Sequence, residues 1–419
     1  MHDPTTESEK PEKPEKPEKP EKPEKPEKPE KPKITITPTE FLRTLAEDEK
    51  NNGRATALIL TKEDILSIKR YERHSLNLPN TLARVEQQLG FTHSGISGLE
   101  PQDLLLTYSA INQHAQSWSA IEVDIKAKGF DLDLFAGEFS NQGKQILDYV
   151  DKMELARQLQ LTVADLTIET VKSLTPAPLT KTDKTVCLSL AETLKKMAVQ
   201  MEAHRKASKK LAEDIKQFAH TLTVDLVPGI NDKVRLASRA DLDEDLIALE
   251  KEIDRLTVDI DQKHQEYKTT KTHITLGLLG GIVGLIVTDS IFGAQAEAIR
   301  KEKNRLVTEK KTRLETFGQK RPLAAAIRSL EVLFEDMKIR MLDAHQSAVN
   351  LQDLWTMLAK YVDNAATRLA DISDDQTLLD FVLEFKSVVT PWEEIKGITT
   401  HLLLTFEQAL DEFSNQQSK

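Results

Sequence analysis

The longest periodic stretch of this chain reads IRSLEVLFEDMKIRMLDAHQSAVNLQDLWTMLAKYVDNAATRLADI over residues 327–372. Apolar residues recur in it at alternating steps of three and four, the period of an α-helix with one apolar face. Its 46 residues predict a helix of about 70 Å, and the 3.5-residue repeat predicts left-handed supercoiling against partners of similar length. The periodic positions are Ile327, Leu330, Phe334, Met337, Met341, Ala344, Ala348, Leu351, Trp355, Leu358, Val362, Ala365, Leu369 and Ile372.

The rest of the chain supplies such partners. Thr61 is expected to cap a helix that Pro79 interrupts, and a loop should follow over residues 90–98. Pro228-Gly229 should end another helix, and Pro391 should bend the last one. We therefore predict an all-α fold, an elongated antiparallel coiled-coil helix bundle within one chain. Its further helices are predicted over residues 38–52, 61–89, 104–118, 135–153, 190–222, 242–260 and 376–415.

Composition agrees with this fold class and narrows the function. Glycine is scarce, at 15 of 419 residues, and aromatic residues make up 5%, which disfavours a sheet protein. The net charge of −11 disfavours nucleic acid as a partner and simple electrostatic docking on anionic lipid. The single cysteine, Cys187, excludes an internal disulfide and a cysteine zinc site. Any membrane affinity must therefore be mostly apolar.

The first 33 residues differ from the rest, because a Pro-Glu-Lys unit repeats from Pro11 to Pro32. We expect residues 1–33 to form a disordered, solvated arm and residues 34–419 to form the helical body. The arm would be a spacer or, alternatively, a ligand for a proline-reading domain. The N-terminus lacks the basic and apolar regions of a secretory signal, so any export is expected by another route.

One apolar segment breaks the polar composition of the body. Residues 274–288 read ITLGLLGGIVGLIVT without a charge, and Asp289 is the only charged residue up to position 296. Glycine is costly in a soluble helix, at about 1 kcal/mol each relative to alanine. In lipid, the spacing of Gly277 with Gly281 and of Gly280 with Gly284 would allow close helix packing.

Three interpretations of residues 274–296 remain open. A single membrane pass is long enough, but it would bury Asp289 and separate the long helices that should pair. A glycine-rich hairpin in the core of the protein is the second. The third is a conditional membrane tip at the end of two paired helices, with its turn at Gly280-Gly281 or at residues 288–290, and it is the interpretation that we favour.

On this interpretation the segment is the membrane-inserting site, and basic residues on both sides of it would suit lipid headgroups. Those flanking residues are Lys268, Lys271, Arg300, Lys301 and Lys303. The candidate inserting residues are Ile274, Leu276, Gly277, Leu278, Leu279, Gly280, Gly281, Ile282, Val283, Gly284, Leu285, Ile286, Val287, Ile291 and Phe292.

No motif for catalysis, a metal or a cofactor accompanies this segment. The sequence contains no phosphate loop, dinucleotide fingerprint, His-Glu-x-x-His or Gly-x-Ser-x-Gly. His204 lies on an apolar helix face, where a packed core histidine is the expected interpretation. We therefore expect no enzymatic activity, no catalytic residues and no metal or cofactor.

The combination of long helices, one glycine-rich apolar insertion and no enzyme motif resembles the cytolysin A class of α-helical pore-forming toxins. More narrowly, residues 274–287 followed by the charged run EAIRKEK over 297–303 resemble the A component of the α-xenorhabdolysin binary toxins. The resemblance covers about residues 38–415.

The resemblance implies a cytolytic, haemolytic virulence protein that is secreted and acts on a target host cell membrane. A soluble monomer would assemble with a B-component protein into a hetero-oligomeric ring, insert the apolar hairpin and open a lytic pore. A structural coiled-coil or membrane-tethered scaffold protein is the alternative function.

Overall fold

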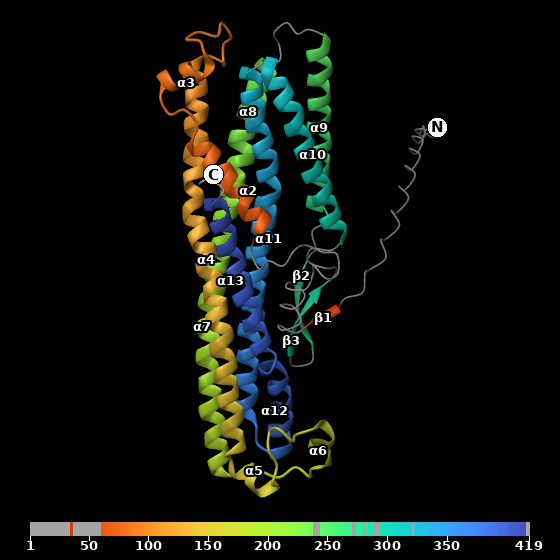
Figure 1. Ribbon diagram of the computed structural model, residues 1–419. Coiled ribbons are helices and arrows are strands. Elements are labelled where there is room, and N and C mark those ends of the chain that lie inside the picture. The colour runs from red at the N-terminus through yellow and green to blue at the C-terminus, as the bar shows by residue number, and fades with distance from the viewer. Residues whose placement is uncertain are drawn as a thin grey trace, which may run out of the picture. The chain divides into compact units, whose positions relative to one another are not determined.

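The computed structural model describes residues 34–36, 60–237, 244–269, 274–279, 282–287, 294–320 and 322–415, all within one compact unit, Lys33–Lys419 (Figure 1). The predicted arm 1–33 and the helix predicted over 38–52 lie outside the described residues. The helices are α2 (Lys62–Leu76), α3 (Leu82–Leu89), α4 (Pro101–Asp151), α5 (Glu154–Leu159), α6 (Ile168–Ser173), α7 (Lys181–His220), the π-helix η2 (Thr221–Leu226), α8 (Val227–Ala237), α9 (Glu244–Thr269), α10 (Ala294–Lys320), α11 (Pro322–Asp371), α12 (Asp375–Val389) and α13 (Trp392–Asn415). The strands are β1 (Ile34–Ile36), β2 (Ile274–Leu279) and β3 (Ile282–Val287).

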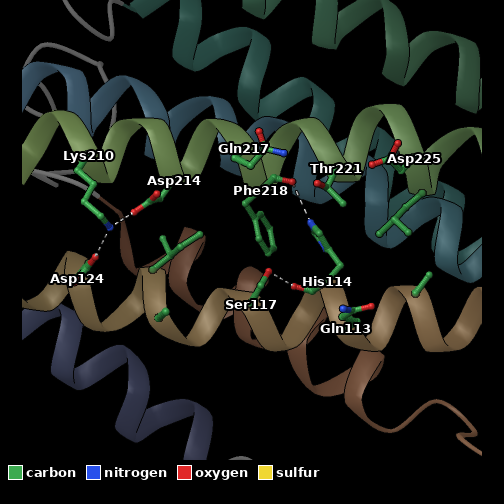
Figure 2. Close-up of a pocket in the computed structure, with 14 residues that line it drawn as sticks. Gln113, His114, Ser117, Asp124, Lys210, Asp214, Gln217, Phe218, Thr221 and Asp225 are labelled. Atoms are coloured by element: carbon green, nitrogen blue, oxygen red, sulfur yellow. Dashed lines mark hydrogen bonds and ion pairs between the residues drawn. The ribbon is translucent and has the colours of Figure 1, made fainter.

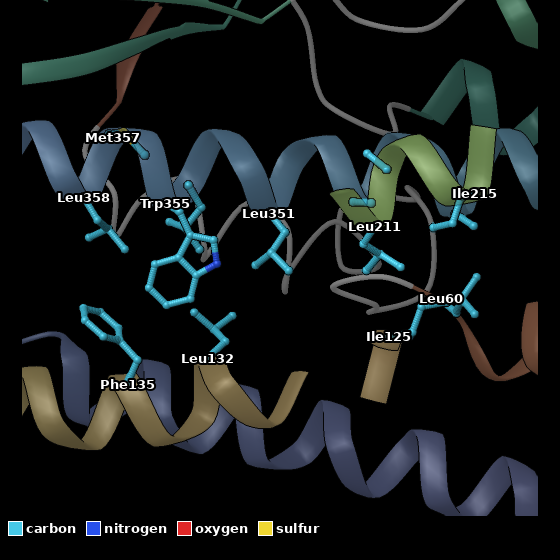
Figure 3. Close-up of a cluster of buried hydrophobic side chains, with 14 of the residues drawn as sticks. Leu60, Ile125, Leu132, Phe135, Leu211, Ile215, Leu351, Trp355, Met357 and Leu358 are labelled. Atoms are coloured by element: carbon cyan, nitrogen blue, oxygen red, sulfur yellow. The ribbon is translucent and has the colours of Figure 1, made fainter. Parts of the chain in front are cut away.

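Among the described elements, α7 and α11 make the most extensive contact. The start of α7 lies beside the end of α11, so the two helices run antiparallel. Every predicted heptad position from Ile327 to Ile372 is buried. We call these positions the apolar seam of α11. Figure 3 shows Trp355 of this seam pointing at Phe135 of α4, with the two ring centroids 4.9 Å apart. The periodic stretch thus places α11 at the centre of the core.

Local signals explain the ends of several helices. Thr61 and Asp64 form a reciprocal capping box at the start of α2, as the cap prediction required. Gly90 ends α3 with a φ of 75°, a left-handed conformation that glycine adopts without strain. The chain also breaks between α2 and α3 near Pro79 and between α12 and α13 at Pro391, as predicted. In contrast, the two helices predicted over 104–118 and 135–153 form one continuous helix, α4.

The prediction that Pro228-Gly229 ends a helix was wrong. The chain continues from α7 through η2 into α8, and Pro228 lies in the first turn of α8. A proline ring collides with the carbonyl four residues earlier in a regular α-helix. Here the preceding turns are π-helical, with the Val227 N–H donating to the Leu222 carbonyl five residues back. The wider turn accommodates the proline without ending the helix.

The apolar segment forms a β-hairpin instead of packed helices. Strand β2 pairs antiparallel with β3 from Ile274↔Val287 to Leu279↔Ile282, so Gly280-Gly281 connects them. Strand β1 pairs with the other edge of β3. The β-branched isoleucines and valines of this segment favour strands, and its glycines are poor helix formers. The all-α class is confirmed by the rest of the body, and these three short strands are its exception among the described elements.

Candidate membrane-insertion site

The β2–β3 hairpin follows α9 and precedes α10 along the chain. These two helices pack on each other, and β3 also contacts α11. Eleven of the candidate inserting residues lie in the two strands. Gly280, Gly281, Ile291 and Phe292 lie outside the described residues. The structure therefore brings the eleven together in one antiparallel register.

Neither strand of this hairpin contains a charged residue, and Thr275 is its only polar one. Successive residues of a strand belong to opposite faces of its sheet. Apolar residues therefore belong to both faces here, whereas a sheet at a protein surface normally alternates apolar and polar residues. Such a hairpin needs cover on two sides or an apolar solvent.

The interface between the α9–α10 pair and α11 contains buried charged side chains beside apolar ones such as Leu314 and Val332. Four charged residues of α11 follow steps of three and four alongside its apolar seam, and we call them the charged seam. Its members are Arg328, Glu331, Glu335 and Lys338.

The charged seam pairs with both helices of the α9–α10 pair. Lys310 of α10 and Glu331 are both buried, and their Nζ and Oε2 atoms lie 2.6 Å apart. The ammonium of Lys303, which is also fully buried, donates to the backbone carbonyl of Glu335.

Three further ion pairs reach α9, one of them between Arg328 and Asp254 at 2.8 Å. Arg328 lies 3.1 Å from Glu250, and Lys338 lies 3.2 Å from Asp261. The α9–α10 pair is thus attached to α11 along its length by ionic contacts.

A second ionic cluster joins α10 and α11 to the first turn of α2. Arg300 of α10 and Arg340 of α11 are 3% and 2% exposed, and each lies 2.9 Å from a carboxylate oxygen of Glu63. Both guanidinium groups also approach Oδ1 of the buried Asp64, at 3.4 and 2.8 Å. Because the other oxygen of Asp64 accepts the Thr61 N–H, one carboxylate caps α2 and binds two other helices.

Burial shifts the pKa of several groups in this interface, among them Lys303 and Glu335. It lowers the pKa of Lys303 to about 8, because water no longer stabilises its ammonium. It raises the pKa of Glu335, although the neighbouring Lys338 and Lys303 favour the carboxylate. The interface thus holds its charges against a desolvation penalty that the apolar seam does not have.

A cavity of about 720 Å³ between α4 and α7 is a second place where chemistry could occur (Figure 2). His114 lies at its wall, 2.6 Å from the hydroxyl of Tyr71 and 3.0 Å from the Phe218 carbonyl, just before η2. The carbonyl can only accept, so Nε2 carries the proton and Nδ1 accepts from Tyr71. Ser117 donates to the His114 backbone carbonyl and not to its ring. This geometry is that of a histidine that ties three helices together, and not of a nucleophile with its base.

No helix among the described residues has an apolar stretch long enough to cross a bilayer. The described residues also contain no cluster of three or more histidine, cysteine or carboxylate side chains with metal-binding geometry.

Comparison with known proteins identifies the architecture. No protein-family model and no curated protein matches the chain. Among solved structures, the chain is similar to SmhA of the tripartite α-pore-forming toxin Smh from Serratia marcescens, with a TM-score of 0.52 and 11% identity over 89% of this chain and 95% of that one. The fold is that of an α-helical pore-forming toxin component.

The chain is also similar to YaxA from Yersinia enterocolitica, with 24% identity and a TM-score of 0.47 over 85% of this chain and 100% of that one. For XaxA from Xenorhabdus nematophila the values are 24% and 0.44, over 86% and 99%. Both are components of the binary α-xenorhabdolysin toxins, the group that the sequence resembles.

The sequence prediction missed the charged seam. Two basic residues that it assigned to lipid headgroups, Arg300 and Lys303, are buried in ion pairs and hydrogen bonds in this structure, whereas Lys301 is exposed. The signal was present, because the charged seam keeps the same spacing as the apolar seam. Periodicity alone cannot tell a buried charge from a solvated one, since both look polar in sequence.

Proposed function

We propose that this chain is a subunit of a binary α-helical pore-forming toxin. It would bind a target-cell membrane, insert the apolar segment 274–296 and assemble with a B-component protein into a hetero-oligomeric ring. The observation that carries the proposal is an uncharged hairpin at the end of a helix pair, within the fold of an α-pore-forming toxin component. The resemblance of residues 274–303 to the A component of α-xenorhabdolysins supports the same function and favours a binary system.

Membrane entry requires the sheet to rearrange. In the described sheet, β1 and β2 are edge strands with unpaired N–H and C=O groups. Each unpaired group costs several kcal/mol in hydrocarbon, so an open sheet does not enter lipid. The segment must therefore become helical or pair with strands of neighbouring subunits. The 23 residues of 274–296 would span about 30 Å of hydrocarbon as one helix.

The proposed function also implies where the chain acts and that it acts without catalysis. The chain would act outside the producing cell as a soluble monomer before it reaches the target membrane. It would have no catalytic residue, cofactor or nucleic-acid partner, because its work is the transfer of apolar surface into lipid at about 25 cal/mol per Å².

Dye release from lipid vesicles tests the proposal. The wild type and the double variant Gly281→Asp/Ile286→Asp are each added to vesicles, with and without a candidate B partner. We expect release with the wild type and a loss of at least about tenfold with the variant, because charge at depth opposes insertion. Val123→Asp/Val199→Asp is the matched control, since it adds the same two negative charges at positions of α4 and α7 that are 63% and 72% exposed.

A second readout does not depend on the partner. An environment-sensitive dye attached to Ile286→Cys, in a Cys187→Ser background that removes the only native cysteine, reports entry into lipid directly. A blue shift with vesicles is the expected result. Intact vesicles and an unshifted dye under all conditions would mean that residues 274–296 belong to the core and that the toxin function is wrong.

A further inference from the structure

We propose that the α9–α10 pair is a detachable element, held on α11 and α2 by buried ion pairs so that it can leave as one body and carry the β2–β3 hairpin with it. The inference rests on the proposed function and names the device that would regulate it.

The α9–α10 pair has its own cohesion. Helix α9 packs on α10 much more extensively than on α11, with Ile253, Leu256 and Ile260 buried. Arg313 of α10 adds an ion pair to Glu252 of α9 at 3.0 Å. Loss of the contacts to α11 would therefore leave α9 and α10 still paired.

The attachment to α11 adds buried charges to its apolar contacts. Lys303 and Lys310 are fully buried, and the polar partners that α11 offers them are Glu331, Glu335 and the backbone of α11. Burying a charge pair loses the hydration of both ions, and this loss roughly cancels the attraction gained. When the pair separates, water hydrates every one of these groups again. These buried charge pairs therefore fix the register of α9–α10 on α11 and themselves contribute little net binding.

Two polar atoms make the attached state more costly still. Oε2 of Glu335 and Nδ1 of His264 are buried and have no hydrogen-bond partner among the described residues. A buried polar atom without a partner costs about 1–3 kcal/mol, which separation would recover.

The chain is built to bend where this element joins the body. Helix α10 ends at Lys320, and Pro322 begins α11 after one intervening residue. Proline has no N–H to continue the hydrogen-bond ladder of α10 and disfavours helical geometry at the residue before it. Helix α10 can therefore change its angle to α11 without breaking regular helical hydrogen bonds at this point.

The test compares removal of both ions of the buried pair Lys310–Glu331 with removal of one ion, because the two changes should affect the attachment of α9–α10 in opposite directions. Replacing both ions of a buried pair with apolar residues is often neutral or stabilising, whereas removing one leaves an uncompensated charge. Lys310→Met/Glu331→Leu should therefore hold α9–α10 more firmly on α11. Glu331→Leu alone should loosen it, because Lys310 stays buried without its carboxylate. The exposed pair Arg305–Glu309 on α10, at 2.9 Å, gives the matched control Arg305→Met/Glu309→Leu.

Two measurements on these full-length variants report whether α9–α10 separates from α11. Hydrogen exchange of the α9 and α10 amides in buffer reports separation without any membrane or partner. The distance between spin labels at Val258→Cys on α9 and Val199→Cys on α7, both exposed, reports movement of the pair in a Cys187→Ser background. We expect about tenfold faster exchange for the single variant, slower exchange and reduced dye release for the double variant, and no change for the control.

The inference is overturned if the double variant separates as readily as the wild type in buffer. It is equally overturned if dye at Ile286→Cys enters vesicles while the distance between the two spin labels stays constant. These outcomes would leave the proposed function standing. A wild type that never enters or permeabilises vesicles would instead refute the proposed function, while exchange in buffer would still decide whether α9–α10 detaches.

Discussion

Helix α11 presents two seams with the same spacing and opposite chemistry. On its core side it buries apolar side chains such as Leu330 and Met337. Toward α9–α10 it buries Arg328, Glu331 and Glu335, and Lys338 is half-buried. Apolar burial gives net stabilisation in proportion to area, whereas buried ion pairs give direction and register with little net gain. On our proposal, α11 is therefore a permanent core element on one side and a releasable support on the other.

The largest expected effect lies in the apolar seam. Trp355 is buried, with a T-shaped contact to Phe135 and a stacked one to His204 at 4.6 Å. Trp355→Ala should lower the free energy of unfolding by about 4 kcal/mol, because a cavity replaces the ring. Chemical denaturation measures this free energy of unfolding. The control Val199→Ala, at an exposed position of α7, should change it by no more than about 0.5 kcal/mol. A loss below about 1 kcal/mol for Trp355→Ala would contradict the assignment of this seam as the core.

The second-largest loss of stability is expected when the ionic cluster at α2 is disrupted. Arg340→Met removes the 2.8 Å partner of Asp64, a carboxylate with no exposure to water. The exchange of α2 and α10 amides should report a loss of about 3 kcal/mol that is confined to these helices. Arg340→Lys should lose less, because it keeps the charge but not the two-pronged geometry. A uniform loss across α7 and α11 would mean that this cluster belongs to the permanent core.

A smaller effect depends on pH and on His264 of α9. Burial, with Lys303 and Lys338 nearby, lowers the pKa of His264 to about 3, while Asp261 opposes and Lys268 adds to this shift. A base whose pKa is lowered on attachment favours attachment only when it is neutral. The attached state is therefore expected to lose stability as pH falls below about 6.5, the value for a free histidine.

Glu335 works in the opposite direction, since its raised pKa makes the attached state take up a proton. The difference between wild type and His264→Asn isolates the histidine. At pH 5.5 we expect the wild type to be about 1 kcal/mol less firmly attached relative to the variant than at pH 7.5, measured by the fraction of separated spin-label distances. Equal pH dependence in both proteins would exclude His264 as a contributor.

The smallest effect should come from ion pairs on the outer face of α10. Arg305 lies 2.8 and 2.9 Å from Glu302 and Glu309, but all three are solvated. Arg305→Ala should change the free energy of unfolding by about 0.5 kcal/mol or less in thermal unfolding. A change of several kcal/mol would show that burial is not what separates the charged seam from ordinary surface pairs.

The helices could be predicted well because their signals are local and periodic. The apolar seam, the cap at Thr61 and the break near Pro391 all follow from residues within one or two turns. Pro228 was misjudged because the π-helix that accommodates it has no recognised sequence signal. The structure has a β-hairpin within the segment 274–296, with Gly280-Gly281 between its strands, and this strand conformation was not foreseen. The glycine spacing that suggested helix packing in lipid also suits an extended hairpin.

By itself, the sequence determined the helical class, the residues of the apolar seam and the position of the uncharged segment. Each of these depends on side-chain type and spacing along one element, which the chain displays directly. The tertiary structure alone decided that Arg300, Lys303 and Lys310 are buried and which carboxylates they meet, some of them more than 200 residues away in sequence, as for Arg300 and Glu63. The reason is that the energy of a charge depends on its surroundings, and those surroundings exist only after distant helices have packed.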